Sequence, residues 1–345
     1  MNSRHGRLLL PPSFICLALS LAGGLSRMGV VQPPSQQIVL YHGPLLVVGF
    51  LAALIAAERA ITLNNVFMHV ASGFFSCGGL LLVFSLDFLT AVLWFGGGLS
   101  FALWALWMVF KFRKNFSNLF FTTASVLLLT GNTFFVLDYP TTYYVFAWVG
   151  FFITFIVGER MDMLKIAKAS RLTYFTASLS IPLLFAGLAL AEKLFFAAAF
   201  TTLLAIAMKH DVALMFLIRK GFGRYLALGL TIAYAWLAVS ALVWATSSSI
   251  DAMLHSIFLG FVGSMVFAHA PIILPAIMKI RHFYTPLLYI PFMLLQLSTA
   301  ARVASAYTIQ LGLWSLSGLL TVTAVACFIA VGPGSVFVKK TFYAK

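Results

Sequence analysis

Long apolar runs separated by short polar connections cover nearly the whole chain of 345 residues. A helix that crosses a membrane needs about 20 mostly apolar residues. By that measure the pattern predicts twelve spans, at residues 8–27, 37–58, 65–86, 88–111, 116–137, 140–159, 172–191, 194–215, 224–247, 251–275, 283–303 and 308–330. The connections leave no room for a soluble domain, so the pattern predicts an all-α membrane protein with twelve transmembrane helices.

The composition agrees with this pattern. The chain is 62% hydrophobic and 9% charged, with a mean hydropathy of +1.03, whereas soluble domains carry about 25% charged residues. Residues 1–27 also resemble a signal peptide, with a basic start and an apolar middle. We expect them to be retained as the first span, because the even count of spans and the repeat described below both need them.

The distribution of charge indicates membrane lipid, and no nucleic acid, as the partner of this basic chain. Its formal net charge is +14, with 22 Lys and Arg residues. If the N-terminus is cytoplasmic, all of these cations lie on the inner side except Arg27, Lys193 and Arg302. This is the positive-inside pattern. It predicts an integral protein of a bacterial-type cytoplasmic (inner) membrane, with both termini cytoplasmic.

A Gly-Phe pair recurs in the second, sixth and tenth predicted spans, beginning at Gly49, Gly150 and Gly260. The offsets between copies are 101 residues (150 − 49) and 110 residues (260 − 150). The pattern predicts three parallel repeats of four helices in a pseudo-threefold arrangement, at residues 1–115, 116–222 and 223–345. Chance similarity is the alternative, because the chain contains 35 Phe and 25 Gly.

Two histidines lie near the outer ends of equivalent spans: His42 in the second and His255 in the tenth. Two neutral imidazoles are suitable axial ligands for a haem iron, and Gly49 and Gly260 would let a flat macrocycle approach the helices. Alternatively, each histidine caps a helix end at the water interface.

Arg302, at the end of the eleventh span, is a candidate partner for a haem propionate through a charge-assisted hydrogen bond. The alternative is a partner among the four outer acids, which are Asp87, Asp138, Glu192 and Asp251.

A second polar layer is predicted at the inner ends of the spans. It contains Glu58, Arg59, Glu159, Arg160, Asp162, Lys209, His210, Asp211 and His269. His269 follows His255 by 14 residues on the same predicted helix face, which puts the two roughly 21 Å apart along the axis, so they cannot bind one metal. We interpret the layer as an ion-pair network. A second metal site at His210 and His269 and a proton entry route are the alternatives.

The span count and the histidines on spans two and ten resemble the catalytic subunit of haem-copper oxygen reductases. That resemblance implies a low-spin haem held by His42 and His255, with an outer arginine on its propionates at the position of Arg302. The segment "HGPLLVVGF" (residues 42–50) is also similar to the span-two motif of the NnrS-like family of haem-copper membrane proteins. A second motif of that family is matched by "HSIFLGFVGSMVFAH" (residues 255–269).

Departures from these motifs limit what the resemblance implies. Pro44 stands where the NnrS-like motif has a second histidine, and the sixth and seventh spans contain no histidine. The oxygen-reducing copper site should therefore be absent.

We expect a protein that binds haem, of the b type, and acts in nitric-oxide response or electron transfer with a redox partner; whether it also binds copper stays open. The alternatives are a cofactor-free transporter of a small solute, with Pro271, Pro275 and Gly96 to Gly98 interrupting helices, and a non-catalytic subunit of a respiratory complex. Whether the chain is an enzyme is undecided. No Walker A or Rossmann glycine motif is present, so ATP or NAD chemistry is not expected.

Overall fold

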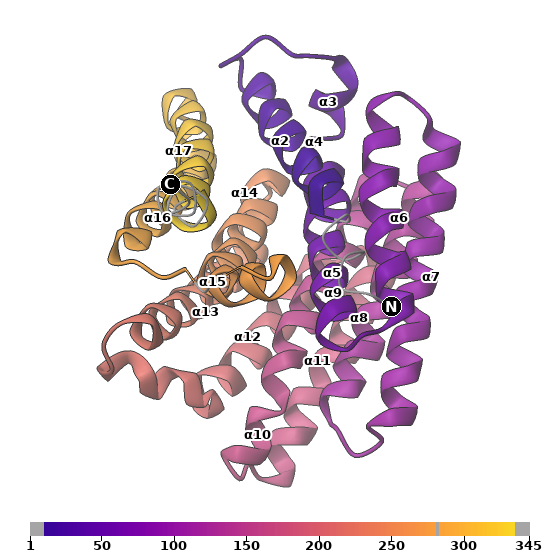
Figure 1. Cartoon of the computed structure of the whole chain (residues 1–345), viewed down its shortest axis with the longest axis vertical. Coiled ribbons are helices and arrows are strands. Elements are labelled where there is room, and N and C mark those ends of the chain that lie inside the picture. The colour runs from indigo at the N-terminus through magenta and orange to yellow at the C-terminus, as the bar shows by residue number, and fades with distance from the viewer. Residues whose placement is uncertain (1–9, 281–282, 335–345) are drawn as a thin grey trace, which may run out of the picture. The chain divides into compact units, whose positions relative to one another are not determined.

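The structure, a computed structural model, describes residues 10–280 and 283–334. All elements in these two ranges are helices, which confirms the all-α prediction (Figure 1). Residues 8 and 9 of the first predicted span lie outside the described residues. So do six of the basic residues assigned to the inner side: Arg4, Arg7, Arg281, Lys339, Lys340 and Lys345.

Eleven segments of the described chain are long and apolar enough to cross a membrane. They are His42–Thr62, Val66–Val83, Asp87–Lys111, Ser117–Val136, Thr141–Ile166, Arg171–Leu190, Lys193–His210, Phe222–Thr246, Ile250–Met278, Pro286–Thr308 and Leu311–Gly334. Each overlaps one of the predicted spans two to twelve. The chain is therefore a polytopic helical protein with the character of an integral membrane protein.

The first predicted span forms helix α2 (Leu10–Arg27). It is not one of the eleven segments, because Pro11, Pro12 and Arg27 lower the hydropathy of this short helix. The count of twelve spans and their threefold arrangement stay predictions.

The chain divides into two compact units, Met1–Glu159 with Ala276–Met278 and Arg160–Pro275 with Lys279–Lys345. Unit 1 contains α2, α3 (Gln36–Leu40), α4 (His42–Pro44), η1 (Leu45–Ala52), α5 (Ala53–Thr62), α6 (Val66–Val83), α7 (Asp87–Lys111), α8 (Ser117–Val136) and most of α9 (Thr141–Met161). Helix α7 packs between α6 and α8, and η1 packs against α2 and α6. Figure 1 shows α6 and α7 running alongside each other.

A chain of buried hydrogen bonds joins four helices of unit 1. Trp148 of α9 donates its indole N–H to Asn132 Oδ1 of α8 at 2.9 Å. Asn132 Nδ2 then donates to the Trp94 carbonyl of α7 at 2.8 Å, and the Trp94 indole donates to the Phe75 carbonyl of α6 at 3.0 Å. Buried polar groups need such partners, so these bonds let large amphipathic rings fill an apolar core.

Unit 2 contains α10 (Met163–Ile166), α11 (Arg171–Leu190), α12 (Lys193–His210), η2 (Val212–Ile218), α13 (Phe222–Thr246), α14 (Ile250–His255), η3 (Ser256–Gly263), α15 (Ser264–Met278), η4 (Pro286–Leu288), α16 (Tyr289–Thr308), α17 (Leu311–Ile329) and η5 (Ala330–Gly334). Helix α12 packs against α11 and α13, α13 packs against η3, and α16 packs against α17. The last residues of α9, Arg160 and Met161, also belong to this unit.

Two of the spans contain long π-helical segments, η1 and η3, each of 8 residues. They begin 211 residues apart (256 − 45 = 211), the same offset that separates Gly49 from Gly260. Helix α9, the equivalent span of the second predicted repeat, is α-helical throughout. The shared position of two π-helices supports the alignment of the first and third repeats more strongly than the Gly-Phe pairs alone.

Candidate functional site

The imidazole of His42 is fixed by its own backbone at the start of α4. Its Nδ1 lies 2.9 Å from the Val39 carbonyl. A carbonyl can only accept, so Nδ1 carries the proton and Nε2 carries the lone pair. The Ser20 hydroxyl of α2 donates to the His42 carbonyl at 2.7 Å. The Nδ1 contact sets the tautomer of this half-buried histidine, which lies three residues before η1.

His255 is set in the same way at the end of α14, directly before η3. Its Nδ1 lies 2.7 Å from the Asp251 carbonyl, which again leaves the lone pair on Nε2. The Asp251 carboxylate lies 3.5 Å from the same Nδ1. A histidine that binds a metal commonly donates its other ring N–H to a carbonyl or carboxylate, and both outer histidines have this arrangement.

Arg302 pairs with Asp251 through two hydrogen bonds, Nε to Oδ2 and Nη2 to Oδ1, each at 2.8 Å. The side chain of Arg302 is only 6% exposed, and its guanidinium lies 4.9 Å from the centre of the Trp314 ring. Of the two partners considered from the sequence, a propionate or an outer acid, the structure shows the acid. Asp251 therefore contacts both the Arg302 guanidinium and the His255 ring.

Protein side chains fill the space beside both candidate glycines. A Cβ added at Gly49 would lie 3.0 Å from the Cys16 sulfur of α2, and one added at Gly260 would lie 2.7 Å from the Trp236 ring of α13. The close approach expected at these positions is therefore made by neighbouring helices. This packing accounts for both glycines without a macrocycle.

The inner layer of unit 1 is an ion-pair cluster. Arg59 Nη2 donates to Glu159 Oε1, and Arg59 Nε lies 3.4 Å from Glu58 Oε2. The guanidinium also lies 5.6 and 5.4 Å from the ring centres of Phe121 and Phe155. The predicted ion pairing of Glu58, Arg59 and Glu159 is present, and the direct partner of Arg59 comes from α9.

The inner layer of unit 2 centres on His269 and Arg160. Arg160 Nη2 lies 2.6 Å from His269 Nε2, and His269 Nδ1 lies 2.9 Å from the Met265 carbonyl. Arginine only donates, so His269 is a neutral imidazole whose Nε2 accepts from the guanidinium.

Asp211 has a different kind of partner. Its Oδ2 accepts from the Tyr234 hydroxyl at 2.5 Å, and its Oδ1 accepts from the Ala213 N–H at 2.9 Å. Asp162 lies just before α10. Tyr234 could not be identified from the sequence, because a tyrosine within an apolar run looks like a core residue.

Among the described residues, no group of three or more His, Cys, Asp and Glu side chains is arranged to hold a metal ion. At the predicted second metal site, the Nε2 of His269 faces the Arg160 guanidinium, which would repel a bound cation. The Nε2 of His210 is buried and has no hydrogen-bond partner within residues 10–280 and 283–334. This geometry favours the ion-pair interpretation of the inner layer over the metal site.

The ion pairs of the two units are equivalent under the predicted repeat. Arg59 aligns with Arg160, and Glu159 aligns with His269. The pair Arg59–Glu159 in unit 1 therefore corresponds to the pair Arg160–His269 in unit 2. In each pair, the arginine of one copy binds the polar side chain of the next copy. This correspondence supports the threefold repeat.

The α-helical count between His255 and His269 loses its basis in the structure. The shared face of His255 and His269 was counted at 100° per residue, but η3 lies between them. A π-helix closes its hydrogen bonds over five residues and has a longer turn, so the α-helical count does not apply there.

Residues 7–336 match the family model described as "Domain of unknown function (DUF8744)". No curated protein and no solved structure matches the chain. Because the family model covers nearly the whole chain, from before α2 to the end of η5, the protein belongs to the DUF8744 family.

Proposed function

We propose that this chain is a haem-binding polytopic membrane protein in which Nε2 of His42 and Nε2 of His255 are the axial ligands. One observation carries the proposal. Each histidine donates its Nδ1–H to a backbone carbonyl three or four residues earlier, and each stands close before a π-helical segment at an equivalent repeat position. π-Helical segments occur frequently at functional sites.

The donor set fits a low-spin haem. Two neutral imidazoles with their second nitrogen anchored are what such an iron requires. Phe50 of η1, and Phe258 and Phe261 of η3, are buried apolar neighbours in the chain and would limit access of water. When bound, the haem would supply a one-electron redox centre, which suits electron transfer or the response to nitric oxide.

The supporting residues need new roles in this proposal. Arg302 would act on His255 through Asp251: the guanidinium fixes the carboxylate, and the carboxylate helps to orient the imidazole. Gly49 and Gly260 would instead leave room for the side chains of Cys16 and Trp236, which pack the two π-helical spans against their neighbours. They would not touch the macrocycle.

The experiment is an absorption spectrum of the detergent-purified protein, expressed with haem supplied. We expect a Soret band and a sharp reduced α-band of the b type, and the loss of the low-spin spectrum in both His42→Ala and His255→Ala. His210→Gln removes an imidazole that has no part in the proposal and should keep the spectrum.

A six-coordinate low-spin spectrum in both alanine variants would show that the ligands are wrong. A wild type without haem would instead favour a transporter of a small solute, for which the Pro271 and Pro275 interruptions of α15 are the supporting feature.

We also propose that α2 is the first of twelve spans, that both termini are cytoplasmic, and that the three predicted repeats of four helices share one fold. The charge distribution supports the orientation. The offset from η1 to η3 equals that from Gly49 to Gly260, and the two arginine pairs join equivalent positions of successive copies; both observations support the repeat.

A further inference from the structure

Helix η2 of unit 2 presents large apolar side chains outside the membrane-crossing segments. It lies between two of these segments, Lys193–His210 and Phe222–Thr246, so it belongs to a connection at one membrane surface. Met215, Phe216 and Ile218 are 72%, 49% and 89% exposed, respectively. Exposed apolar patches of this kind mark surfaces that bind a partner or a membrane.

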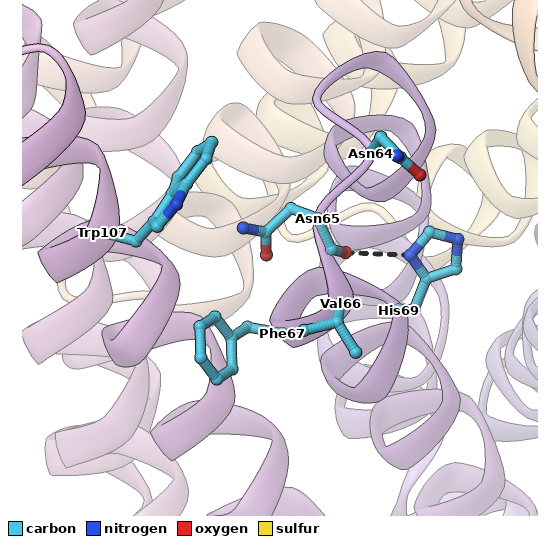
Figure 2. Close-up of a pocket in the computed structure, with 6 residues that line it drawn as sticks. All are labelled: Asn64, Asn65, Val66, Phe67, His69 and Trp107. Carbon is cyan, nitrogen blue, oxygen red and sulfur yellow. Dashed lines mark hydrogen bonds between the residues drawn. The ribbon is translucent and has the colours of Figure 1, made fainter. Parts of the chain in front are cut away.

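The connection from α5 to α6, in unit 1, has the opposite character. It contains Asn64 and Asn65, which line a pocket of about 420 Å³ together with His69 and Trp107 (Figure 2). Such polar side chains suit a connection that meets water. The 7 residues of η2, "VALMFLI", are all apolar, so this connection is not expected to lie in water.

Contacts at both ends hold η2 against α13. Asp211 directly precedes η2; its Oδ1 accepts from the Ala213 N–H at 2.9 Å, and its Oδ2 accepts from the Tyr234 hydroxyl of α13 at 2.5 Å. Beyond the other end, Gly221 has a φ of +69°, which glycine adopts without strain, and the chain turns back into α13. The apolar face of η2 is therefore held in a defined position.

Positive charge directly follows this apolar face. Arg219, Lys220 and Arg224 are all exposed, and residues 212–224 contain no carboxylate. None of these three cations forms an ion pair within the part of the chain that the structure describes. Apolar side chains bordered by lysine and arginine are typical of segments that lie in a membrane interface, and such cations are attracted to anionic lipid headgroups.

Aromatic rings gather at the same end of α13. The centre of the Phe222 ring lies 5.6 Å from that of Tyr284. The centre of the Tyr225 ring lies 5.8 Å from that of Tyr284 and 5.2 Å from that of Tyr289. Tyrosine is enriched where a membrane meets water. This cluster supports a position at the level of the lipid headgroups for η2, which comes shortly before Phe222.

We propose that η2 is an interfacial anchor for anionic phospholipid. Its apolar side chains enter the outer part of the acyl region, and Arg219 and Lys220 bind the phosphates of the headgroups. The three exposed cations and the position between two membrane-crossing segments favour this occupant over a soluble protein. The proposal does not depend on haem binding.

The test places a nitroxide spin label on the full-length protein in lipid nanodiscs. In a background without Cys16, Cys77 and Cys327, the label is attached at Ile218→Cys. The control position is Arg113→Cys, because Arg113 is exposed and follows α7. Electron paramagnetic resonance measures collisions with oxygen, which concentrates among acyl chains, and with a nickel chelate, which stays in water. The oxygen-to-nickel ratio should be several-fold higher at Ile218→Cys than at Arg113→Cys.

The lipid composition provides a second readout. The ratio at Ile218→Cys should be higher in discs that mix phosphatidylglycerol with phosphatidylcholine than in discs of phosphatidylcholine alone. The double variant Arg219→Gln with Lys220→Gln should abolish this difference. The matched control, Arg113→Gln with Lys114→Gln, removes the same charge from another connection and should keep the difference.

Two results would overturn the proposal. Equal ratios at Ile218→Cys and Arg113→Cys would place η2 in water and assign its apolar face to a soluble protein partner. The same ratio at Ile218→Cys in both kinds of disc would exclude a role for anionic lipid. Melting temperatures identify any variant that is not folded, and the comparison of the two discs needs no charge variant.

Discussion

Asp251 joins two outer residues, Arg302 and His255, that appeared independent in the sequence. It accepts two hydrogen bonds from Arg302 and lies beside the ring of His255. A bidentate arginine–carboxylate pair has a fixed geometry, so the carboxylate can hold the imidazole in one orientation. The Trp314 ring covers the guanidinium, and the Arg302 side chain is only 6% exposed.

Asp251→Asn should lower the melting temperature by an amount that corresponds to about 2 kcal/mol, because the buried Arg302 guanidinium loses its charged partner. The figure is below that for a fully buried pair because the Asp251 side chain is 31% exposed. Thermal unfolding in detergent measures this loss of stability. The control variant is Asp138→Asn, because Asp138 is an exposed acid. The double variant combines Asp251→Asn with Arg302→Gln. If its loss of stability equals the sum of the two single losses, the two side chains do not interact.

In the inner layer, Glu159→Gln should destabilise the protein more than Glu58→Gln. Glu159 accepts directly from Arg59, whereas Glu58 lies 3.4 Å from Arg59 Nε. We expect a loss of about 2 kcal/mol for Glu159→Gln and about half of that for Glu58→Gln. Chemical unfolding of both variants under the same conditions measures the order. The reverse order would mean that Glu58 is the main partner of Arg59.

At the scale of elements, the π-helical segments are held by close packing. The Trp236 ring covers Gly260 of η3, and its indole N–H donates to Gln296 Oε1 of α16 at 2.6 Å. Gln296 Nε2 in turn donates to Ser264, the first residue of α15, at 3.1 Å. A polar network therefore crosses from α13 to α16 next to η3, where the regular α-helical ladder is interrupted.

Gly260→Ala should test this packing. The new methyl group would lie 2.7 Å from the Trp236 ring, so the ring or the helix must move, at a cost of about 1–3 kcal/mol. Gly312→Ala is the control, because a Cβ there has nothing within 4 Å and alanine favours a helix. Equal melting temperatures for Gly260→Ala and Gly312→Ala would show that the Trp236 ring does not pack on η3.

At the scale of the whole molecule, the charge distribution predicts which connections lie on each side of the membrane. The connection from α7 to α8 carries Arg113 and Lys114, directly after Lys111 at the end of α7, whereas the connection from α8 to α9 carries Asp138. This is the asymmetry expected of inner and outer loops.

A labelling experiment measures this orientation. In a background without Cys16, Cys77 and Cys327, a maleimide that cannot cross membranes should label Asp138→Cys in intact cells. It should label Arg113→Cys only after the cells are opened. Labelling of Arg113→Cys in intact cells would reverse the topology.

Much of the fold could be predicted from the sequence because apolar length alone defines a membrane-crossing helix. Eleven predicted spans coincide with such helices. The π-helices could not be predicted, because their sequences "LLVVGFLA" and "SIFLGFVG" contain nothing that distinguishes them from α-helical runs. In the fold, η1 packs against α2 and α6, and η3 packs against α13. The partner of Arg302 was among the four outer acids considered, but four candidates could not be reduced to Asp251 without the fold.

The two markers of the repeat have a consequence for its history. The π-helix occurs in the first and third copies, whereas the Glu-Arg dipeptide occurs in the first and second, because the third copy has His269 and Ala270 at those positions. If the predicted repeats arose by duplication, this distribution predicts that the first copy retains the most of the ancestral unit and that the third copy lost its arginine later. Relatives in the family with Arg at position 270 would support this order of events. Relatives in which the first copy lacks both markers would contradict it.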